Sequence, residues 1–261
     1  MIYITGDCHG DFQRFTKQQR KKLPYQFTEQ DFMMICGDFG LLWCKDKELV
    51  YNLRWLSTLP PVILWVQGNH ENYDMIAEYS LELWHGGLVR HIVRDRIILL
   101  ERGQVFEIEG KRFLTFGGAS SHDVQGGILD KTSPDYKAEK KRAVKRQLPY
   151  RVRHETWWEQ ELPTEEEMQR CQENLSKVDD TVDCVVTHCL SSRMQEEMEY
   201  HYGGGLGPKL YEPDILTDFF DELEEKLQYK LWFCGHYHVN LRLDDKHMVL
   251  YDEIRCLNEF L

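Results

Sequence analysis

The sequence VILWVQGNHE, residues 62–71, decides the fold that we expect for this chain. Its apolar run is short, rich in β-branched and aromatic residues and closed by Gly68, which is typical of a buried strand. Asn69, His70 and Glu71 follow, so the strand would deliver an amide, an imidazole and a carboxylate to the edge of a sheet. In the alternative interpretation, Asn69 starts a helix in a capped turn and His70 is merely solvated.

Four other apolar runs end in polar groups of the same kind, which favours the first interpretation. They lead into Asp7-Cys8-His9, Gly37-Asp38, Thr187-His188 and Gly235-His236-Tyr237-His238. The first three runs read as a β-α-β-α-β pattern, which predicts a parallel sheet with functional side chains at the carboxyl ends of its strands. Closely spaced runs at 97–100, 104–108 and 112–116 predict a second sheet. Helices are expected at 46–58, near 73–82 and from about 213.

Length and composition indicate one globular domain over residues 1–261, with 42% hydrophobic residues. No apolar stretch approaches the ~20 residues of a membrane helix, so no membrane partner is expected. The amino terminus has no basic region followed by an apolar one. Eight scattered cysteines form no Cys-x-x-Cys pair, which argues against disulfides and against a thiolate zinc site. We therefore expect a cytoplasmic protein.

The net charge of −12 is unevenly distributed along the chain. Residues 131–153 hold nine Lys or Arg against two acidic residues, whereas residues 155–173 hold seven glutamates against Arg170. Both segments fall in a charged helical insertion expected at about 126–177. We favour two solvated helical faces that neutralise each other. The alternative is a patch that binds nucleic acid or steers phosphate.

The polar strand ends together suit a metal site. Aspartate, histidine and asparagine without thiolates form a hard to borderline ligand set, which suits Mn, Fe, Zn or Ni. The candidates are more numerous than one ion needs, and two ions sharing a carboxylate would use them all. Such pairs, ~3.5–4 Å apart, serve in-line displacement at phosphorus, because two cations neutralise the phosphate oxygens and acidify a bridging water.

In this ordered set of motifs the chain resembles the calcineurin-like metallophosphoesterases. The resemblance implies a four-layer α/β/β/α sandwich of two mixed sheets and hydrolysis of phosphate esters by a metal-bridging hydroxide. It implies two divalent ions, Mn²⁺ foremost, with Asp38 bridging them. The ligands that it implies for the ions are Asp7, His9 and His238 for one, and Asn69, His188 and His236 for the other. His70 would be the catalytic histidine that binds no metal, and Glu71 a partner that fixes its orientation.

One departure from the family bears on substrate. In the protein-phosphatase branch, the bridging aspartate continues into an Asp-Arg-Gly segment whose arginine grips phosphate, whereas Asp38 here continues into the apolar residues 39–43. We expect phosphodiester hydrolysis, with a nucleotide or nucleic acid as substrate, slightly ahead of phosphomonoester hydrolysis. A binding scaffold without catalysis is a third alternative, disfavoured because all seven ligands and His70 are present.

Three further residues are candidate substrate contacts. Arg193 follows the fourth motif, Lys209 follows a glycine-rich loop at 202–207, and His122 lies in a polar segment. The glycine-rich loop lacks the Gly-Lys-Ser/Thr ending of a phosphate-binding P-loop. For each of the three, an ordinary surface position is the alternative.

Overall fold

The amino-terminal apolar runs form the first sheet of the structure, a computed structural model that describes residues 1–202 and 211–260. Its strand order is β15-β1-β2-β3-β6-β5-β4. The central strands β1, β2, β3 and β6 are mutually parallel, as the β-α-β-α-β pattern predicts. Antiparallel pairs complete the sheet at both edges, so it is mixed. In chain order, the strands are β1 (Ile2–Thr5), β2 (Phe32–Ile35), β3 (Val62–Trp65), β4 (Leu81–Trp84), β5 (Gly87–Val93), β6 (Ile97–Leu100) and β15 (Arg255–Cys256).

The second sheet has the order β13-β14-β12-β11-β8-β7 and is also mixed. Strands β8, β11, β12 and β14 are parallel, while β7 and β13 are antiparallel to their neighbours. The strands are β7 (Gln104–Ile108), β8 (Lys111–Phe116), β11 (Cys184–Thr187), β12 (Leu231–Cys234), β13 (Leu241–Arg242) and β14 (His247–Val249).

Two expectations about the middle of the chain are wrong. The run at 97–100 is β6 of the first sheet, where it pairs with β3, and is not part of the second sheet. The helix expected near 73–82 ends after one turn, as α3 (Tyr73–Ile76), and Glu82 lies in β4. Strand β5 is not predicted from the sequence.

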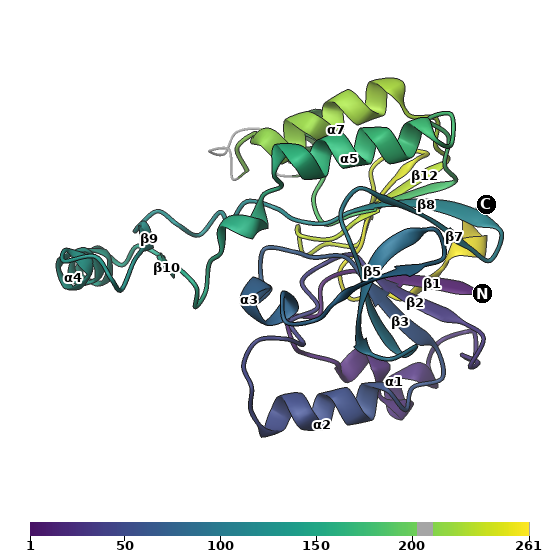
Figure 1. Ribbon diagram of the computed structural model, residues 1–261, viewed down its shortest axis with the longest axis horizontal. Coiled ribbons are helices and arrows are strands. Elements are labelled where there is room, and N and C mark those ends of the chain that lie inside the picture. The colour runs from purple at the N-terminus through teal and green to yellow at the C-terminus, as the bar shows by residue number, and fades with distance from the viewer. Residues whose placement is uncertain (203–210, 261) are drawn as a thin grey trace.

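Helices cover the outer face of each sheet and complete the four-layer sandwich expected from the resemblance (Figure 1). The short α1 (Lys17–Arg20) and the longer α2 (Lys47–Leu56) lie on the first sheet, and α5 (Glu165–Ser176) and α7 (Ile215–Lys226) lie on the second. Helix α6 (Ser192–Tyr202) packs beside α7. Short 3-10 turns occur at Gln13–Phe15, Glu159–Glu161 and Leu257–Glu259. Within the described ranges, no helix is long and apolar enough to cross a bilayer.

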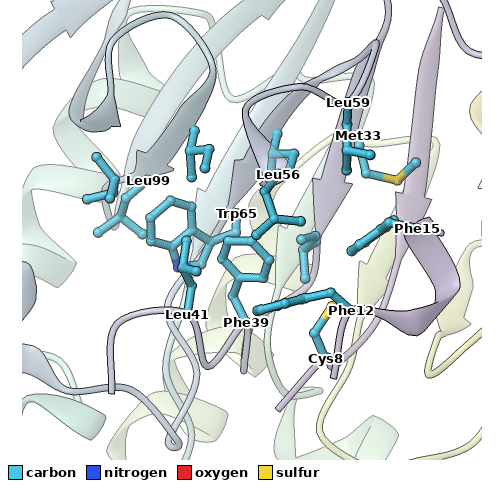
Figure 2. Close-up of a cluster of buried hydrophobic side chains, with 14 of the residues drawn as sticks. Cys8, Phe12, Phe15, Met33, Phe39, Leu41, Leu56, Leu59, Trp65 and Leu99 are labelled. Carbon is cyan, nitrogen blue, oxygen red and sulfur yellow. The ribbon is translucent and has the colours of Figure 1, made fainter. Parts of the chain in front are cut away.

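The core beneath the first sheet holds the apolar residues that stand next to the polar motifs (Figure 2). Cys8 lies between two motif residues and is 3% exposed, while Phe39 follows Asp38 and is fully buried. Phe39 packs against Trp65 of β3, with ring centroids 5.2 Å apart. Truncating a phenylalanine in such a position costs about 3–5 kcal/mol. The apolar residues after Asp38 therefore anchor the polar loops to the core.

The charged insertion consists of two separate parts. Residues 126–153, which we call the arm, contain β9 (Ile128–Leu129), α4 (Tyr136–Arg146) and β10 (Arg151–Val152), and α4 lies away from the sandwich (Figure 1). Strands β9 and β10 pair in parallel between α4 and the sandwich (Figure 1). Helix α5 instead buries Cys171 and Leu175 against the second sheet. Within the described ranges no ion pair joins α4 to α5, but Lys131 pairs with Glu155 and Arg153 pairs with Glu159, so the basic and acidic segments neutralise each other where they meet.

Candidate metal centre

Strand register brings the five motifs to one place. Thr5, Ile35 and Trp65 are in register across β1, β2 and β3, so the residues that follow them leave the first sheet side by side. Strands β11 and β12 are likewise adjacent and parallel in the second sheet. Since side chains at the carboxyl ends of parallel strands meet at one edge, the two sheets present their polar groups to a common centre.

Asp7, His9 and His238 form the first group of metal-ligating side chains. His9 Nε2 lies 2.9 Å from His238 Nε2 and 3.6 Å from Asp7 Oδ2. His238 Nε2 lies 3.3 Å from the same carboxylate oxygen. One ligand atom from each residue thus lies within 4.8 Å of the others. These are two imidazoles and a carboxylate directed at one point, as a divalent ion of borderline hardness requires.

Asn69, His188 and His236 form the second group, next to Asp38. His188 Nε2 lies 3.2 Å from Asn69 Oδ1 and 3.4 Å from Asp38 Oδ2. The ring of His236 is centred 5.0 Å from the ring of His188. Asp38 Oδ2 also lies 3.7 Å from His9 Nδ1 of the first group. One carboxylate oxygen therefore stands between the two groups.

Backbone groups orient both carboxylates. Asp7 Oδ1 accepts a hydrogen bond from the His236 N–H at 2.9 Å, and Asp38 Oδ1 accepts one from the His70 N–H at 2.7 Å. In each case Oδ2 is the oxygen that faces histidine nitrogens. His188 is held similarly, because its Nδ1 lies 2.7 Å from the Cys36 carbonyl oxygen, which leaves Nε2 for the centre. Such supporting contacts fix the tautomer and direction of a metal ligand.

The motif glycines leave room for ligands from other motifs. A Cβ on Gly68 would lie 2.0 Å from Asp38 Oδ1, and a Cβ on Gly235 would lie 2.1 Å from Asp7 Oδ1. Any side chain at these positions would displace a ligand carboxylate.

Four of the candidate ligands have left-handed backbone conformations. The φ angles are 48° at His9, 45° at Asp38, 69° at His236 and 50° at His238. This region is sparsely populated by residues other than glycine, and such residues cluster at functional sites. The conformation turns these side chains back toward the sheet ends from which they come.

The electrostatics of the centre suit a cation. Burial raises the pKa of Asp7, but hydrogen bonds to His238 and His9 outweigh it and lower that pKa to about 2. Burial lowers the pKa of His188, yet Asp38 and Asp7 raise it to about 9. Both effects show carboxylates that remain ionised and draw positive charge into a buried site. The donor set and its charge therefore fit divalent ions.

A buried hydrogen-bonded chain supports Asn69. Its Nδ2 donates to Ser121 Oγ at 3.3 Å, and Ser121 Oγ donates to Glu161 Oε2 at 2.7 Å. Glu161 is 1% exposed, and burial raises its pKa to about 8. Its Oε1 has no hydrogen-bond partner within the described ranges. The chain holds the amide of Asn69 so that Oδ1 faces His188.

His70 lies beside the first group without joining it. Its ring is centred 5.1 Å from the ring of His9. Arg151, from β10 of the arm, places Nη2 2.9 Å from His70 Nε2, and Asp123 Oδ1 accepts from Arg151 Nε at 2.8 Å. Burial lowers the pKa of His70 to about 4, and Arg151 adds to this while Asp38 opposes it.

Glu71 supports the centre from a different side than expected. Its Oε1 accepts a hydrogen bond from the Phe39 N–H at 2.8 Å, so it holds the loop after Asp38 and not the ring of His70. Burial raises the pKa of Glu71 to about 8, and nearby Asp38 adds to the shift.

The three candidate substrate contacts have different positions. The ring of His122 is centred 5.8 Å from that of His236, at the second group. It lines a cavity of about 350 Å³ together with Ser120 and Tyr211. Arg193 forms ion pairs with Asp221 and Glu225 of α7. Lys209 and most of the glycine-rich loop lie outside the described residues.

A larger groove of about 740 Å³ borders the first group of ligands at His9. His9, Arg14, Tyr25, Tyr251 and Arg255 are among its lining residues. Tyr251 stacks on the His238 ring, with centroids 5.0 Å apart. The two groups of ligands are thus each flanked by open space.

Sequence reasoning missed Arg151, Asp123, Ser121 and Glu161. The only signal for Arg151 is its place in the basic segment, a pattern that favours a solvated face. Ser121 and Asp123 lie in the same polar segment as His122, and Glu161 lies in a run of glutamates. Nothing local in the sequence separates these residues from their neighbours.

The chain was compared with protein-family models, with curated proteins and with solved structures. A family model described as calcineurin-like phosphoesterase matches residues 1–240. The comparison with curated proteins found no match. Among solved structures, the chain is similar to the crystal structure of phosphopantetheinyl hydrolase (PptH) from Mycobacterium tuberculosis. That pair has a TM-score of 0.47 and 15% sequence identity, and the match covers 96% of this chain and 87% of the other.

Proposed function

Because the chain belongs to the calcineurin-like phosphoesterase family, and is therefore a metal-dependent phosphoric ester hydrolase, we propose that it works with two divalent ions bridged by Asp38. The observation that carries this proposal is the position of Asp38 Oδ2, which lies 3.7 Å from His9 Nδ1 and 3.4 Å from His188 Nε2. Asp7 lies near both groups as well, since its ligand oxygens are within 4.8 Å of ligand atoms of His9 and His238 and of Asp38 and His188.

Each group would hold one ion. Asp7, His9 and His238 would bind the first, and Asn69, His188 and His236 the second. Mn²⁺ is the ion that we expect first, with Fe, Zn and Ni as alternatives, because the ligands are hard to borderline donors. When bound, the ions would neutralise phosphate oxygens and acidify a water molecule.

The residues around the ions would orient the ester. His70 is neutral before substrate arrives, because burial lowers its pKa to about 4. A neutral imidazole carries one N–H, and this group can donate to the leaving oxygen or to a phosphate oxygen. His122 faces the second group from the smaller cavity, where it would contact the substrate.

We favour a phosphodiester as substrate, from a nucleotide or nucleic acid, over a phosphomonoester. Support comes from the charge of α4, where Lys137, Lys141, Arg142, Lys145 and Arg146 are exposed and form no ion pair with described residues. A projecting cationic helix of this kind attracts a polyanionic backbone.

The test is hydrolysis of bis-p-nitrophenyl phosphate alongside p-nitrophenyl phosphate in the presence of Mn²⁺. We expect activity on both esters and a higher rate on the diester. His70→Ala should retain its metal while its turnover falls by roughly 10²- to 10⁴-fold, because acid-base assistance is lost. A higher rate on the monoester would reverse the substrate preference, and unchanged turnover in H70A would remove His70 from the reaction.

A further inference from the structure

The arm brings a buried guanidinium to the metal centre. Arg151 is 8% exposed, although it belongs to a segment whose other cations are mostly exposed. Burying a cation is unfavourable unless anions and hydrogen-bond acceptors surround it. The position of Arg151 therefore calls for a functional explanation.

Two contacts hold the guanidinium at its rear. Nε donates to Asp123 Oδ1 at 2.8 Å, and Nη1 donates to the Thr156 carbonyl oxygen at 3.3 Å. The remaining N–H groups of an arginine lie in the plane of the same rigid fork. These two contacts fix that plane and leave its other edge to face the centre.

The edge that faces the centre meets the imidazole of His70. Nη2 lies 2.9 Å from His70 Nε2, and Nη1 lies 3.4 Å from His70 Nδ1. Both partner atoms belong to an imidazole, which is a poorer match for a guanidinium than an anion with two oxygens. His70 in turn is next to His9, so this edge borders the space in which the phosphate of a substrate would lie.

The segment that directly follows the arm is fixed to α3, the helix that follows His70. Trp158 is fully buried, and its Nε1 donates to Asp74 Oδ2 of α3 at 2.8 Å. His154 Nδ1 lies 2.9 Å from the same oxygen. Helix α3 begins three residues after His70. These contacts fix the position of the arm relative to the turn that contains His70.

We propose that Arg151 is a catalytic residue, whose guanidinium binds the non-bridging oxygens of the substrate phosphate beside His70. This inference rests on the proposed function. The guanidinium forms no covalent bond. It supplies two N–H donors and a positive charge to oxygens that become more negative as the ester is cleaved. An insertion in the chain thus completes a site otherwise built from strand ends.

The test compares Arg151→Met with Arg153→Met, in which the exposed arginine two residues along the chain is changed. Arg153 forms an ion pair with Glu159 and does not contact His70. We expect kcat/KM for bis-p-nitrophenyl phosphate to fall by roughly 10²- to 10³-fold in R151M, the usual effect of losing one oxyanion donor. Inhibition by inorganic phosphate should weaken in R151M as well. R153M should stay within about twofold of the wild type.

Arg151→Lys separates a role in binding from a role in folding. Lysine keeps the charge but loses the planar fork, so R151K should recover part of the rate and part of the phosphate inhibition. Metal content and thermal unfolding should match the wild type. The inference is overturned if R151M behaves like R153M, or if R151K and R151M lose activity equally and in proportion to lost metal. If R151M does not fold, phosphate inhibition of R151K decides alone. An inhibition constant for phosphate equal to that of the wild type would then overturn the inference.

Failure of the proposed function would look different. Wild-type protein that hydrolyses neither ester with any of the four metals would contradict the proposed two-ion centre and diester preference. An active wild type with an unaffected R151M would contradict only the role of Arg151.

Discussion

At the scale of single residues, the metal centre stores conformational free energy. His9, Asp38, His236 and His238 all have left-handed backbones, and each such residue costs about 1–3 kcal/mol. Their neighbours hold them there, since buried residues such as Cys8 and Phe39 fix the loops on either side. Binding of ions to these ligands would offset this conformational free energy.

Ser121 provides a prediction at this scale. In Ser121→Ala the link between Asn69 and Glu161 is lost, so the Asn69 amide is free to turn away from His188. We expect the affinity of the second ion to fall roughly 10- to 100-fold, as is usual when a partner of a metal ligand is removed. Titration of the metal-free protein with Mn²⁺ would measure it.

Ser120→Ala is the matched control for that titration. Ser120 precedes Ser121 in the chain, and its hydroxyl contacts Asp214 at the start of α7. Both affinities should equal those of the wild type in S120A. Equal affinities in S121A and the wild type would show that the Asn69 amide needs no support from Ser121.

The sequence predicted the candidate ligands better than their partners, for a physical reason. A strand followed by glycine and a polar residue is a local pattern, and parallel register brings such patterns together without further information. Arg151 contacts a residue that is 81 positions away, and its neighbours have the same charge. Its role depends on the path of the arm, which no local pattern encodes. The resemblance implied that Glu71 orients His70, yet the carboxylate of Glu71 accepts a hydrogen bond from the Phe39 N–H.

At the scale of elements, the two charged helices have separate environments. Helix α5 begins with a capping box at Thr164, and Arg102 forms an ion pair with Glu167 in its first turn. Acidic side chains there also interact favourably with the helix dipole. Helix α4 has no such neighbours among the described residues, and its cations remain in solvent. The sign reversal along the sequence therefore reflects two helices with different tasks.

Helix α4 gives a prediction about macromolecular substrates. We expect that replacing four of its cations by glutamine raises KM for a single-stranded oligonucleotide and leaves bis-p-nitrophenyl phosphate unaffected. The dependence of log KM on log salt concentration should become shallower by about 1 for each phosphate group that the helix no longer binds. The substitutions are Lys137→Gln, Lys141→Gln, Lys145→Gln and Arg146→Gln.

A variant with an equal change of charge elsewhere controls for net charge. This variant removes four exposed cations that are distant from the arm. Two lie on α2, one follows α5 and one lies on α7; the substitutions are Lys47→Gln, Arg54→Gln, Lys177→Gln and Lys226→Gln. If both variants change the oligonucleotide KM equally, the effect belongs to overall charge, and α4 makes no specific contact.

The errors at this scale come from short elements. Runs of four or five residues at 97–100 and 104–108 look alike in sequence, but β6 joins the first sheet and β7 the second. Their assignment depends on packing between the sheets, where Ile98 and Phe106 share one core cluster. Helix α3 is short because the chain turns at Tyr79 to enter β4, and periodicity over 73–82 does not reveal that turn.

At the scale of the whole molecule, the metal centre joins two sheets. Asp7, Asp38 and Asn69 follow strands of the first sheet, while His188 and His236 follow strands of the second. Ions bound here would connect the two halves of the sandwich in addition to the apolar core between them. Metal binding and the docking of the sheets are therefore linked.

We accordingly expect that removing the metal with a chelator lowers the unfolding temperature. One site at a thousandfold excess of ion over Kd contributes about 4 kcal/mol, and each kcal/mol shifts Tm by roughly 2–4 °C for a chain of this size. Scanning calorimetry with and without Mn²⁺ would measure the shift. The Asp38→Asn variant should bind both ions weakly and lose most of this shift in unfolding temperature. A D38N protein that keeps two ions and the full shift would contradict the bridging role.

The long sequence separation between ligands of the first group also has a consequence for synthesis of the chain. His9 and His238 are 229 positions apart, yet their Nε2 atoms lie 2.9 Å from each other. A ribosome that adds about 5–20 residues each second needs roughly 10–50 s to pass from one to the other. During that interval the nascent chain presents Asp7, His9, Asp38 and Asn69 without their histidine partners from the second sheet. The choice of ion would therefore be postponed until His238 has left the ribosome, when the finished geometry, and not the first metal encountered, would decide which ions are kept.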